Sequence, residues 1–237
     1  LELITRQRLQ TATAAQVRDW WRALAARPEH AQIRPLLLTQ AYLAEHPEGG
    51  PELIPSPSFE LEGAPAEQVL SDADLQKFDW ARLDQRLPGW STWHFQQSVT
   101  RFYWDPTEAH TGSRSLSVRE NQIAGCFQTA VRVTPGARYR LSFWVKQQPP
   151  DRGGSMSIRW MNEKGWADQG AGAVARITVE YPKGAESTWR QVVVTFTAPE
   201  GVTSCLPLFS APRQTAAEGI WFDDISMVQI YDPALDG

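Results

Sequence analysis

The chain has 237 residues, a formal net charge of −4 at neutral pH and 42% hydrophobic residues. This composition allows a packed core and argues against global disorder, and no apolar run is long enough to cross a membrane. The negative charge, with no local run of Lys and Arg, argues against nucleic acid as a partner, because phosphate binding needs a concentrated basic surface.

The first 46 residues have helical spacing. Thr13 is predicted to cap a helix whose apolar positions include Val17, Trp21 and Leu24, and Pro28 is predicted to end it. A second helix is predicted from His30 to His46. A pair of helices cannot bury both apolar faces alone, so we expect this segment, residues 1–50, to dock on the following domain or to be the tail of an upstream domain. The sequence starts at Leu1 without a signal peptide, and we expect a processed form or a fragment of a longer protein.

From Leu53 onward, short β runs alternate with Gly, Pro, Asn and Asp, which is typical of a β-sandwich or barrel. Residues 51–237 are therefore predicted to form one β domain, with residues 64–88 as an insertion over it. The predicted strands are Ser113–Arg119, Cys126–Val133, Arg138–Lys146, Met156–Met161, Ala175–Glu180, Arg190–Ala198, Ser204–Ser210 and Ile220–Ile230.

Alternation along these strands assigns their faces. On the strand Cys126–Val133, the apolar positions point inward and leave Gln128 and Arg132 outside, where they form a candidate sugar-contacting pair. An ordinary solvated strand face is the alternative. Arg159 has the opposite parity to its apolar neighbours and is predicted to point outward as well, into a ligand-binding cleft.

The last strand places a carboxylate among apolar residues. Asp223 shares its parity with Trp221, Ile225 and Met227, and a buried carboxylate must be paired, protonated or bound to a metal. Calcium prefers carboxylate and carbonyl oxygens and is a natural partner. The alternative is an Asp at the strand end that is hydrated or held by backbone N–H groups.

The two cysteines, Cys126 and Cys205, are too few for a disulfide framework or a thiolate zinc site. Both lie near the starts of their predicted strands. If those strands are antiparallel neighbours, the two starts lie at opposite ends, too far apart for a disulfide. We predict that the two cysteines are not bonded to each other.

Several short motifs occur in one order along the chain. Together they resemble the carbohydrate-binding modules of families four, nine and twenty-two, which share a galactose-binding-like jelly roll, and the resemblance covers about residues 55–230. The motifs are Ser56–Glu60, Ala109–Leu116, Val131–Gly136, Tyr139–Lys146, Thr188–Trp189, Phe196–Pro199 and Trp221–Ser226.

This resemblance implies a structural calcium ion that ties the first strand to the last. Glu60 matches the first-strand acid, and Asp223 or Asp224 matches the last-strand acid. Backbone carbonyls of the turn Gly112–Ser115 would complete the shell.

Sugar recognition in such modules implies aromatic stacking. The chain has 11 Trp, and each of them can fill the core or serve as a stacking platform. Trp166, which follows a turn, is the first candidate platform, and Trp104, beside Asp105–Pro106, is the second. Trp160 has the parity of a core residue. Trp90 and Trp93 flank a strand start and remain open between the two roles.

Motifs for catalysis are absent from the sequence. No His has a partner at metal-ligand spacing, and no Gly-x-Ser-x-Gly nucleophile motif occurs. Glu163 and Asp168, near Trp166, are the only carboxylates that we consider as a glycosidase pair. We therefore expect a non-catalytic module, secreted or at the cell surface, that binds polysaccharide or oligosaccharide beside an upstream catalytic domain. The alternatives are a cell-surface interaction or spacer module of the same fold, and a glycan-active enzyme.

Overall fold

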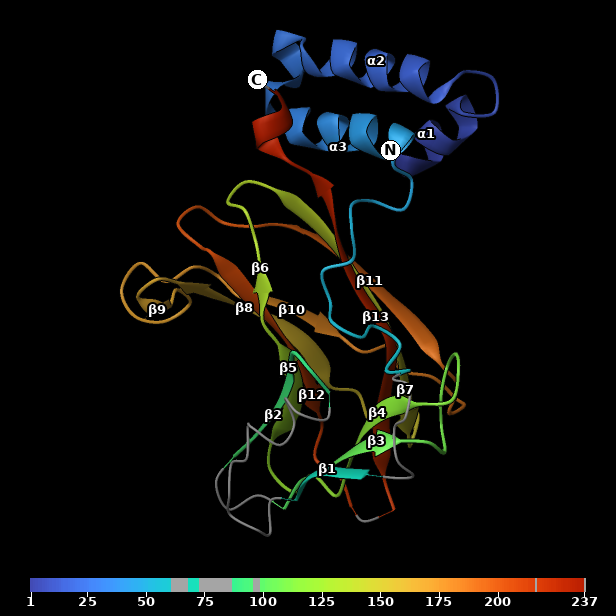
Figure 1. Cartoon of the computed structure of the whole chain (residues 1–237), viewed down its shortest axis with the longest axis vertical. Coiled ribbons are helices and arrows are strands. Elements are labelled where there is room, and N and C mark those ends of the chain that lie inside the picture. The colour runs from blue at the N-terminus through green and yellow to red at the C-terminus, as the bar shows by residue number, and fades with distance from the viewer. Residues whose placement is uncertain (61–67, 73–86, 96–98, 216, 237) are drawn as a thin grey trace.

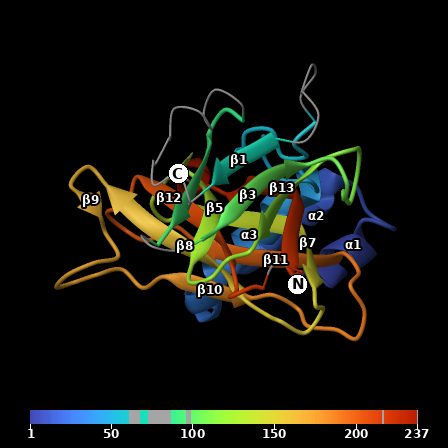
Figure 2. The same cartoon turned by 90° about the horizontal axis from the view of Figure 1, so that it is seen from below.

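The computed structural model describes residues 1–60, 68–72, 87–95, 99–215 and 217–236. It shows three short α-helices standing on one end of a two-layer β-sandwich (Figure 1). In the view from below, the helices lie behind the sandwich (Figure 2). The predicted fold, a β-sandwich preceded by a helical segment, is confirmed. Among the described residues, no helix is long and apolar enough to span a membrane.

The helical unit consists of α1 (Glu2–Arg8), α2 (Ala14–Ala25) and α3 (Arg34–Glu45). Thr13 caps α2 as predicted: its hydroxyl accepts the Gln16 N–H at 3.3 Å, and the Gln16 side chain accepts the Thr13 N–H at 2.9 Å. This reciprocal capping box satisfies two N–H groups that the first helical turn leaves without partners. The second predicted helix begins later than expected, because residues Pro28–Ile33 form a 3-10 turn first.

Two antiparallel sheets form the sandwich. The first sheet has the strand order β1-β3-β4-β13-β7-β11, and the second has the order β10-β8-β12-β5-β2, with β6 paired to β12 and β9 to β8. The strands of the first sheet are β1 (Gln68–Asp72), β3 (Arg101–Asp105), β4 (Ser115–Arg119), β13 (Gly219–Tyr231), β7 (Arg138–Gln148) and β11 (Arg190–Thr197). Those of the second are β10 (Ile177–Glu180), β8 (Ser155–Asn162), β12 (Ser204–Ala211), β5 (Gly125–Thr129), β2 (Trp90–His94), β6 (Val131–Arg132) and β9 (Gly165–Trp166).

All eight predicted strands are present, the second of them divided into β5 and β6. The strands β1, β2, β3 and β9 were not predicted. Within the expected insertion 64–88, residues 68–72 form β1 at the edge of the first sheet, and residues 73–86 lie outside the described part of the chain.

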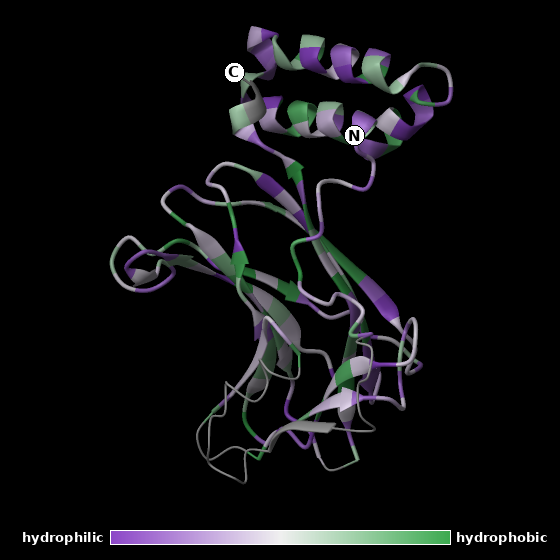
Figure 3. Cartoon of the chain, in the orientation of Figure 1, coloured by the Kyte–Doolittle hydropathy of each residue, from purple (hydrophilic) through white to green (hydrophobic). Residues whose placement is uncertain are grey.

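The core lies between the sheets, where hydrophobic residues alternate with hydrophilic ones along the strands (Figure 3). On β7, the inward residues Tyr139, Leu141, Phe143 and Val145 are buried, as the alternation predicts. Trp160 is also buried in this core, as its parity predicts. The ring of Phe143 lies 5.1 Å from that of Phe209 in an edge-to-face contact, an arrangement that aromatic pairs prefer.

The helical unit docks on the end of β13, which is one of the two docking surfaces expected. Leu43 of α3 packs against Val228 and Ile230, and Tyr231 joins the cluster that fills the space between α2 and α3. Glu52, in the connecting segment, accepts the Met227 N–H at 2.9 Å. The helices are therefore attached to the strand at the centre of the first sheet.

Cys126 and Cys205 are both free, which confirms that they are not bonded to each other. Cys205 lies in the core, whereas Cys126 is paired opposite Trp93 on the outer side of the second sheet. Burial raises the pKa of each thiol to about 12, so neither is a thiolate at neutral pH.

Candidate functional site

Four of the five predicted sugar-contacting residues lie on one surface, the outer face of the second sheet, which we call the second-sheet face. Directly paired residues of antiparallel strands point to the same side. Arg159 of β8 is paired with Leu206, Arg132 of β6 with Ser204, and Gln128 of β5 with Leu208. Trp166 of β9 is paired with Met161, which follows the inward Trp160 and thus points outward.

Trp166 presents an indole ring to solvent at one corner of this face. The residue is 39% exposed, and the guanidinium carbon of Arg159 lies 3.7 Å from its ring centroid. This cation–π contact holds the ring while leaving part of it uncovered. Trp93 of β2, on the strand at the opposite edge of the sheet, is 41% exposed on the same face. Sequence reasoning left Trp93 undecided, because a residue near a strand start gives no clear parity.

A buried carboxylate supports the arginine beneath Trp166. Arg159 donates from Nε to Oδ2 of Asp168 at 2.8 Å and from Nη2 to Oδ1 at 3.0 Å, and Arg176 donates from Nε to the same Oδ2. Burial alone would raise the pKa of Asp168, but the hydrogen bonds and charges of the two arginines lower it below its usual value. Asp168 is therefore an ionised anchor. An ionised carboxylate that two arginines share does not suit the role of the proton donor in a glycosidase pair.

Trp104 does not lie at a surface, and its assignment as a stacking platform is corrected. It is 2% exposed, and its Nε1 donates to the carbonyl of Phe59 at 3.0 Å. Trp104 is paired with Leu116, another core residue, so the alternation of β3 turns its ring inward. Gln128 does lie on the second-sheet face but is nearly buried, and only a small part of it can meet a ligand.

A hollow of about 600 Å³ lies at the end of the second-sheet face. Arg132 and Ser204 belong both to the face and to the wall of this hollow, which Thr134, Tyr139 and Glu163 also line. Its volume falls within the range of ligand pockets.

The three predicted calcium ligands lie around one loop, residues 108–114, on the other side of the molecule. Glu60 Oε1 accepts the N–H groups of Ser113 at 2.7 Å and Arg114 at 2.8 Å. Asp223 Oδ2 accepts the N–H groups of His110 at 2.7 Å and Thr111 at 3.2 Å. The two carboxylates therefore hold the same loop through its backbone.

Asp223 reaches this loop for a reason that the parity argument missed. The register of β13 shifts between Asp223 and Ser226, and Asp224 has a φ of 46°. This bulge inverts the alternation, so that Ile225 and Met227 point into the core while Trp221 and Asp223 point outward. The expected parity of Asp223 with Ile225 is thus wrong. Asp223 is nonetheless fully buried, and burial raises its pKa to about 6.

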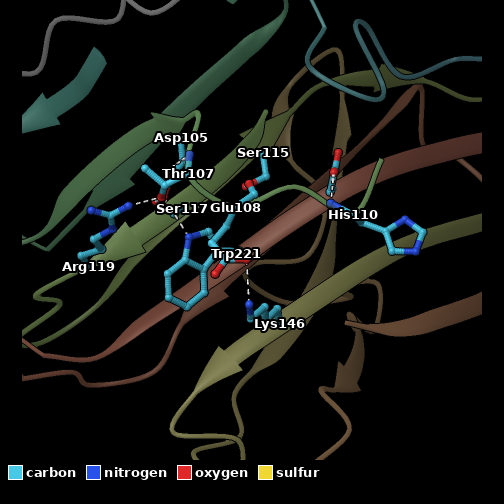
Figure 4. Close-up of polar contacts among 10 residues, drawn as sticks. Asp105, Thr107, Glu108, His110, Ser115, Ser117, Arg119, Lys146 and Trp221 are labelled. Atoms are coloured by element: carbon cyan, nitrogen blue, oxygen red, sulfur yellow. Dashed lines mark hydrogen bonds and ion pairs between the residues drawn. The ribbon is translucent and has the colours of Figure 1, made fainter. Parts of the chain in front are cut away.

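A further buried carboxylate, Asp105, lies nearby on the outer side of the first sheet (Figure 4). Its oxygens accept hydrogen bonds from Thr107, from Ser117 at 2.9 Å, from Trp221 Nε1 at 2.8 Å and from Arg119. Burial would raise the pKa of Asp105, but these donors lower it below its usual value. With every oxygen satisfied by protein groups, the cluster fixes β3, β4 and β13 to one another.

The model of the carbohydrate binding domain family CBM_4_9 matches residues 78–215, more than half of the chain. The chain belongs to this family. No curated protein matches it.

Solved structures similar to this carbohydrate binding domain have low identity to it. They include the enzymatically active domain of bacteriophage CBA120 tailspike protein 4 (TM-score 0.46, 15% identity, 74% of this chain and 22% of that chain). An arabinose-bound α-L-arabinofuranosidase, MgGH51, has a TM-score of 0.47 and 14% identity, over 76% of this chain and 27% of that one. TmCBM61 in complex with β-1,4-galactotriose has a TM-score of 0.43 and 14% identity, over 76% of this chain and 99% of that one. The chain thus spans about a quarter of the length of the tailspike and arabinofuranosidase chains.

The calcium ion that the family resemblance implies can be compared with the donor set of this carbohydrate binding domain. Glu60 packs on Gly112, where a Cβ atom would lie 2.5 Å from Oε1, so the close approach of the carboxylate requires glycine. A carboxylate offers about four lone-pair sites, and the N–H and O–H donors to Glu60 and Asp223 leave room on each. Within the described residues, no group of three or more His, Cys, Asp and Glu could hold a metal ion. Two carboxylates would thus need backbone carbonyls beside them, and calcium stays a prediction.

Proposed function

We propose that this chain is a non-catalytic carbohydrate-binding module that holds a polysaccharide or oligosaccharide on its second-sheet face. Membership of the family supports carbohydrate binding as the function. The observation that carries the choice of surface is Trp166, which is partly exposed and held in place by Arg159. An indole fixed in this way offers a flat apolar surface to the C–H face of a sugar ring.

The rest of the face supports the same role. Trp93 offers a second exposed ring, and between the two edges Arg132 offers hydrogen-bond donors beside the small exposed part of Gln128. The terminal nitrogens of arginine and the amide of glutamine suit sugar hydroxyl groups, which both donate and accept hydrogen bonds. A chain of several sugar residues could therefore contact both ends of the face.

The absence of catalysis is part of the proposal. A glycosidase needs two carboxylates on opposite sides of the bond that it cleaves, one of them able to give a proton. Beside Trp166, Asp168 is buried, ionised and shared by two arginines. We place the module in a secreted or cell-surface protein that acts on polysaccharides, with a catalytic domain upstream.

Affinity electrophoresis in gels containing soluble polysaccharides, with pull-down on insoluble ones, tests this function. We expect retarded migration or retention on at least one polysaccharide, with no release of reducing ends during prolonged incubation. Release of reducing ends would show a glycan-active enzyme. Failure to bind any member of a broad panel would favour a spacer or protein-interaction module.

The structural calcium ion is a separate proposal, independent of the sugar site. Glu60 and Asp223 would hold it, with Asp224 as the alternate ligand, and it would join the segment before the sandwich to the last strand. A cation there would offset the unfavourable burial of Asp223, whose pKa is raised to about 6. Its role would be to stabilise the loop 108–114 and not to contact sugar.

A further inference from the structure

Positive charge is in excess around the exposed ring of Trp166. Two guanidinium groups, those of Arg159 and Arg176, share the single carboxylate of Asp168. One carboxylate can balance only one of them, so the cluster retains a positive charge. This excess lies on a chain whose overall net charge is −4, so it is a local feature and not a reflection of composition.

Arg176 is the member of the cluster that faces solvent. Its side chain is 47% exposed, compared with 17% for Arg159. Its Nε atom is bonded to Asp168, and its terminal Nη1 and Nη2 atoms have no hydrogen-bond partner within the described part of the chain. The guanidinium group is therefore oriented by one bond and presents its remaining donors outward.

Other ionisable groups on the face do not reverse this balance. Arg132 is exposed and Lys164 lies in the turn beside Trp166, and both add positive charge. Glu163 in the same turn adds one negative charge. Glu180, at the end of β10, is paired with Ser155 of β8. Ser155 precedes Arg159 by four residues, so Glu180 lies about 13 Å along the strand from Arg159.

We propose that the polysaccharide bound on the second-sheet face is anionic and carries carboxylate or sulfate groups. This inference rests on the proposed function and names its substrate class. Arg176 shares Asp168 with the arginine that stacks on Trp166, and its planar donors match two oxygens of a carboxylate or a sulfate. A neutral sugar would leave this excess charge unused.

Matched polymer pairs test the proposal, because the members of each pair share a backbone and differ in charge. The binding of polygalacturonate is compared with that of highly methyl-esterified pectin, and that of dextran sulfate with that of dextran, at low and at physiological salt. We expect tighter binding of at least one charged member than of its neutral partner, and a loss of that difference as salt screens it. Preference within the first pair would identify carboxylate as the recognised group, and preference within the second would identify sulfate.

Arg176→Gln is the variant that addresses the mechanism. It removes the exposed guanidinium group while Arg159 still holds Asp168, and we expect the affinity for the preferred charged polymer to fall roughly tenfold or more. Arg27→Gln is the matched control, because it removes an exposed arginine from the helical unit, away from the face. An unchanged melting temperature would show that Arg176→Gln is folded. Should its melting temperature fall, Arg132→Gln is measured in its place.

The outcomes separate this inference from the proposed function. Equal binding of charged and neutral members, or binding of a neutral glycan alone, would overturn the anionic class and leave the carbohydrate-binding function intact. Equal loss of charged-polymer affinity in Arg176→Gln and Arg27→Gln would overturn the site, because it would reveal a general charge effect. Failure to bind any polymer would contradict the proposed function itself.

Discussion

At the scale of single residues, Trp166 and Trp104 have the same side chain, but the first is partly exposed and the second is buried in the core. Trp166→Ala should abolish or strongly weaken glycan binding and change the melting temperature little, because the ring is partly exposed and packs mainly on Arg159. Trp104→Ala should cost roughly 3–5 kcal/mol of unfolding free energy, the range for a large aromatic truncated in a core. Affinity electrophoresis and urea unfolding of both variants check these expectations.

Trp20 offers a matched control for Trp166. Its ring is also partly buried and lies under an arginine, with the Arg8 guanidinium carbon 3.5 Å from the centroid, but it belongs to the helical unit. Trp20→Ala should leave glycan binding unchanged. Equal loss of binding in both tryptophan variants would show that Trp166 acts through stability and not through contact.

Asp105 yields a prediction about pH. Its pKa in the folded protein lies below the ordinary value, so its interactions stabilise the fold above about pH 4, the pKa of an unfolded Asp. That stabilisation is lost as the pH falls through the lower, folded value. Asp105→Asn should reduce the unfolding free energy by roughly 1.5–3 kcal/mol at pH 7, because it removes the buried charge that accepts hydrogen bonds from Ser117, Trp221 and the partly exposed Arg119.

The difference in unfolding free energy between wild type and Asp105→Asn should shrink as the pH falls below the pKa of an ordinary Asp, because the carboxylate of the wild type then takes up a proton. Urea unfolding of both proteins across this pH range measures it. A difference that stays constant with pH would mean that the variant disturbs packing and not a charged interaction.

At the scale of elements, every strand of eight residues or more was predicted, whereas the strands that were missed, β1, β2, β3 and β9, are all short. The stretch Tyr139–Val145 alternates strictly over its whole length, and the structure extends it into β7, Arg138–Gln148. By contrast, β2 and β3 are five residues each, and two or three apolar positions do not define a period. The misplacement of Trp104 followed directly, because without β3 its parity could not be assigned.

A bulge is the second kind of feature that alternation cannot anticipate. In β13, one extra residue at Asp224 reverses the faces of the residues that follow, up to a second register shift between Gln229 and Tyr231. The acid at position 223 was therefore singled out correctly as a buried carboxylate but placed on the wrong side of the strand. On the second-sheet face, Gln128, Arg132 and Arg159 were assigned correctly to one surface, because no bulge interrupts β5 or β8 in their registers.

A calcium ion held by Glu60 and Asp223 would tie β13 to the loop 108–114. Thorough demetallation should lower the melting temperature by several degrees, and added calcium but not sodium should restore it. A ligand that binds only the folded state stabilises it by roughly 2.7 kcal/mol at a hundredfold excess over its Kd. Magnesium should substitute poorly, because it requires a tighter octahedral shell.

Asp223→Ala is the matching variant, and it should remove the response to calcium. Equal melting temperatures of demetallated and calcium-loaded wild type would contradict the site. The N–H donors from His110, Thr111, Ser113 and Arg114 would then account for both carboxylates without a metal.

At the scale of the whole molecule, the helical unit and the sandwich should unfold as one. Tyr231 fills the cluster between α2 and α3, and Leu43 packs on the end of β13. Helical ellipticity and tertiary fluorescence should therefore report coincident transitions in urea, which is a test of two-state behaviour. Tyr231→Ala should separate the two transitions, whereas Val193→Ala, at an exposed position of β11, should leave them coincident. Separate transitions in the wild type would contradict this coupling.

The tryptophans differ in exposure, so the intrinsic fluorescence of the protein can report on the second-sheet face. Of the described tryptophans, only Trp93 and Trp166 are exposed by more than a third, and both lie on the second-sheet face. Acrylamide dissolved in the surrounding water should quench these two indoles first and remove the red edge of the emission spectrum, while the blue-shifted emission of the buried rings persists. A glycan laid across the face would shield the same two rings, so unlabelled protein can report where its ligand sits.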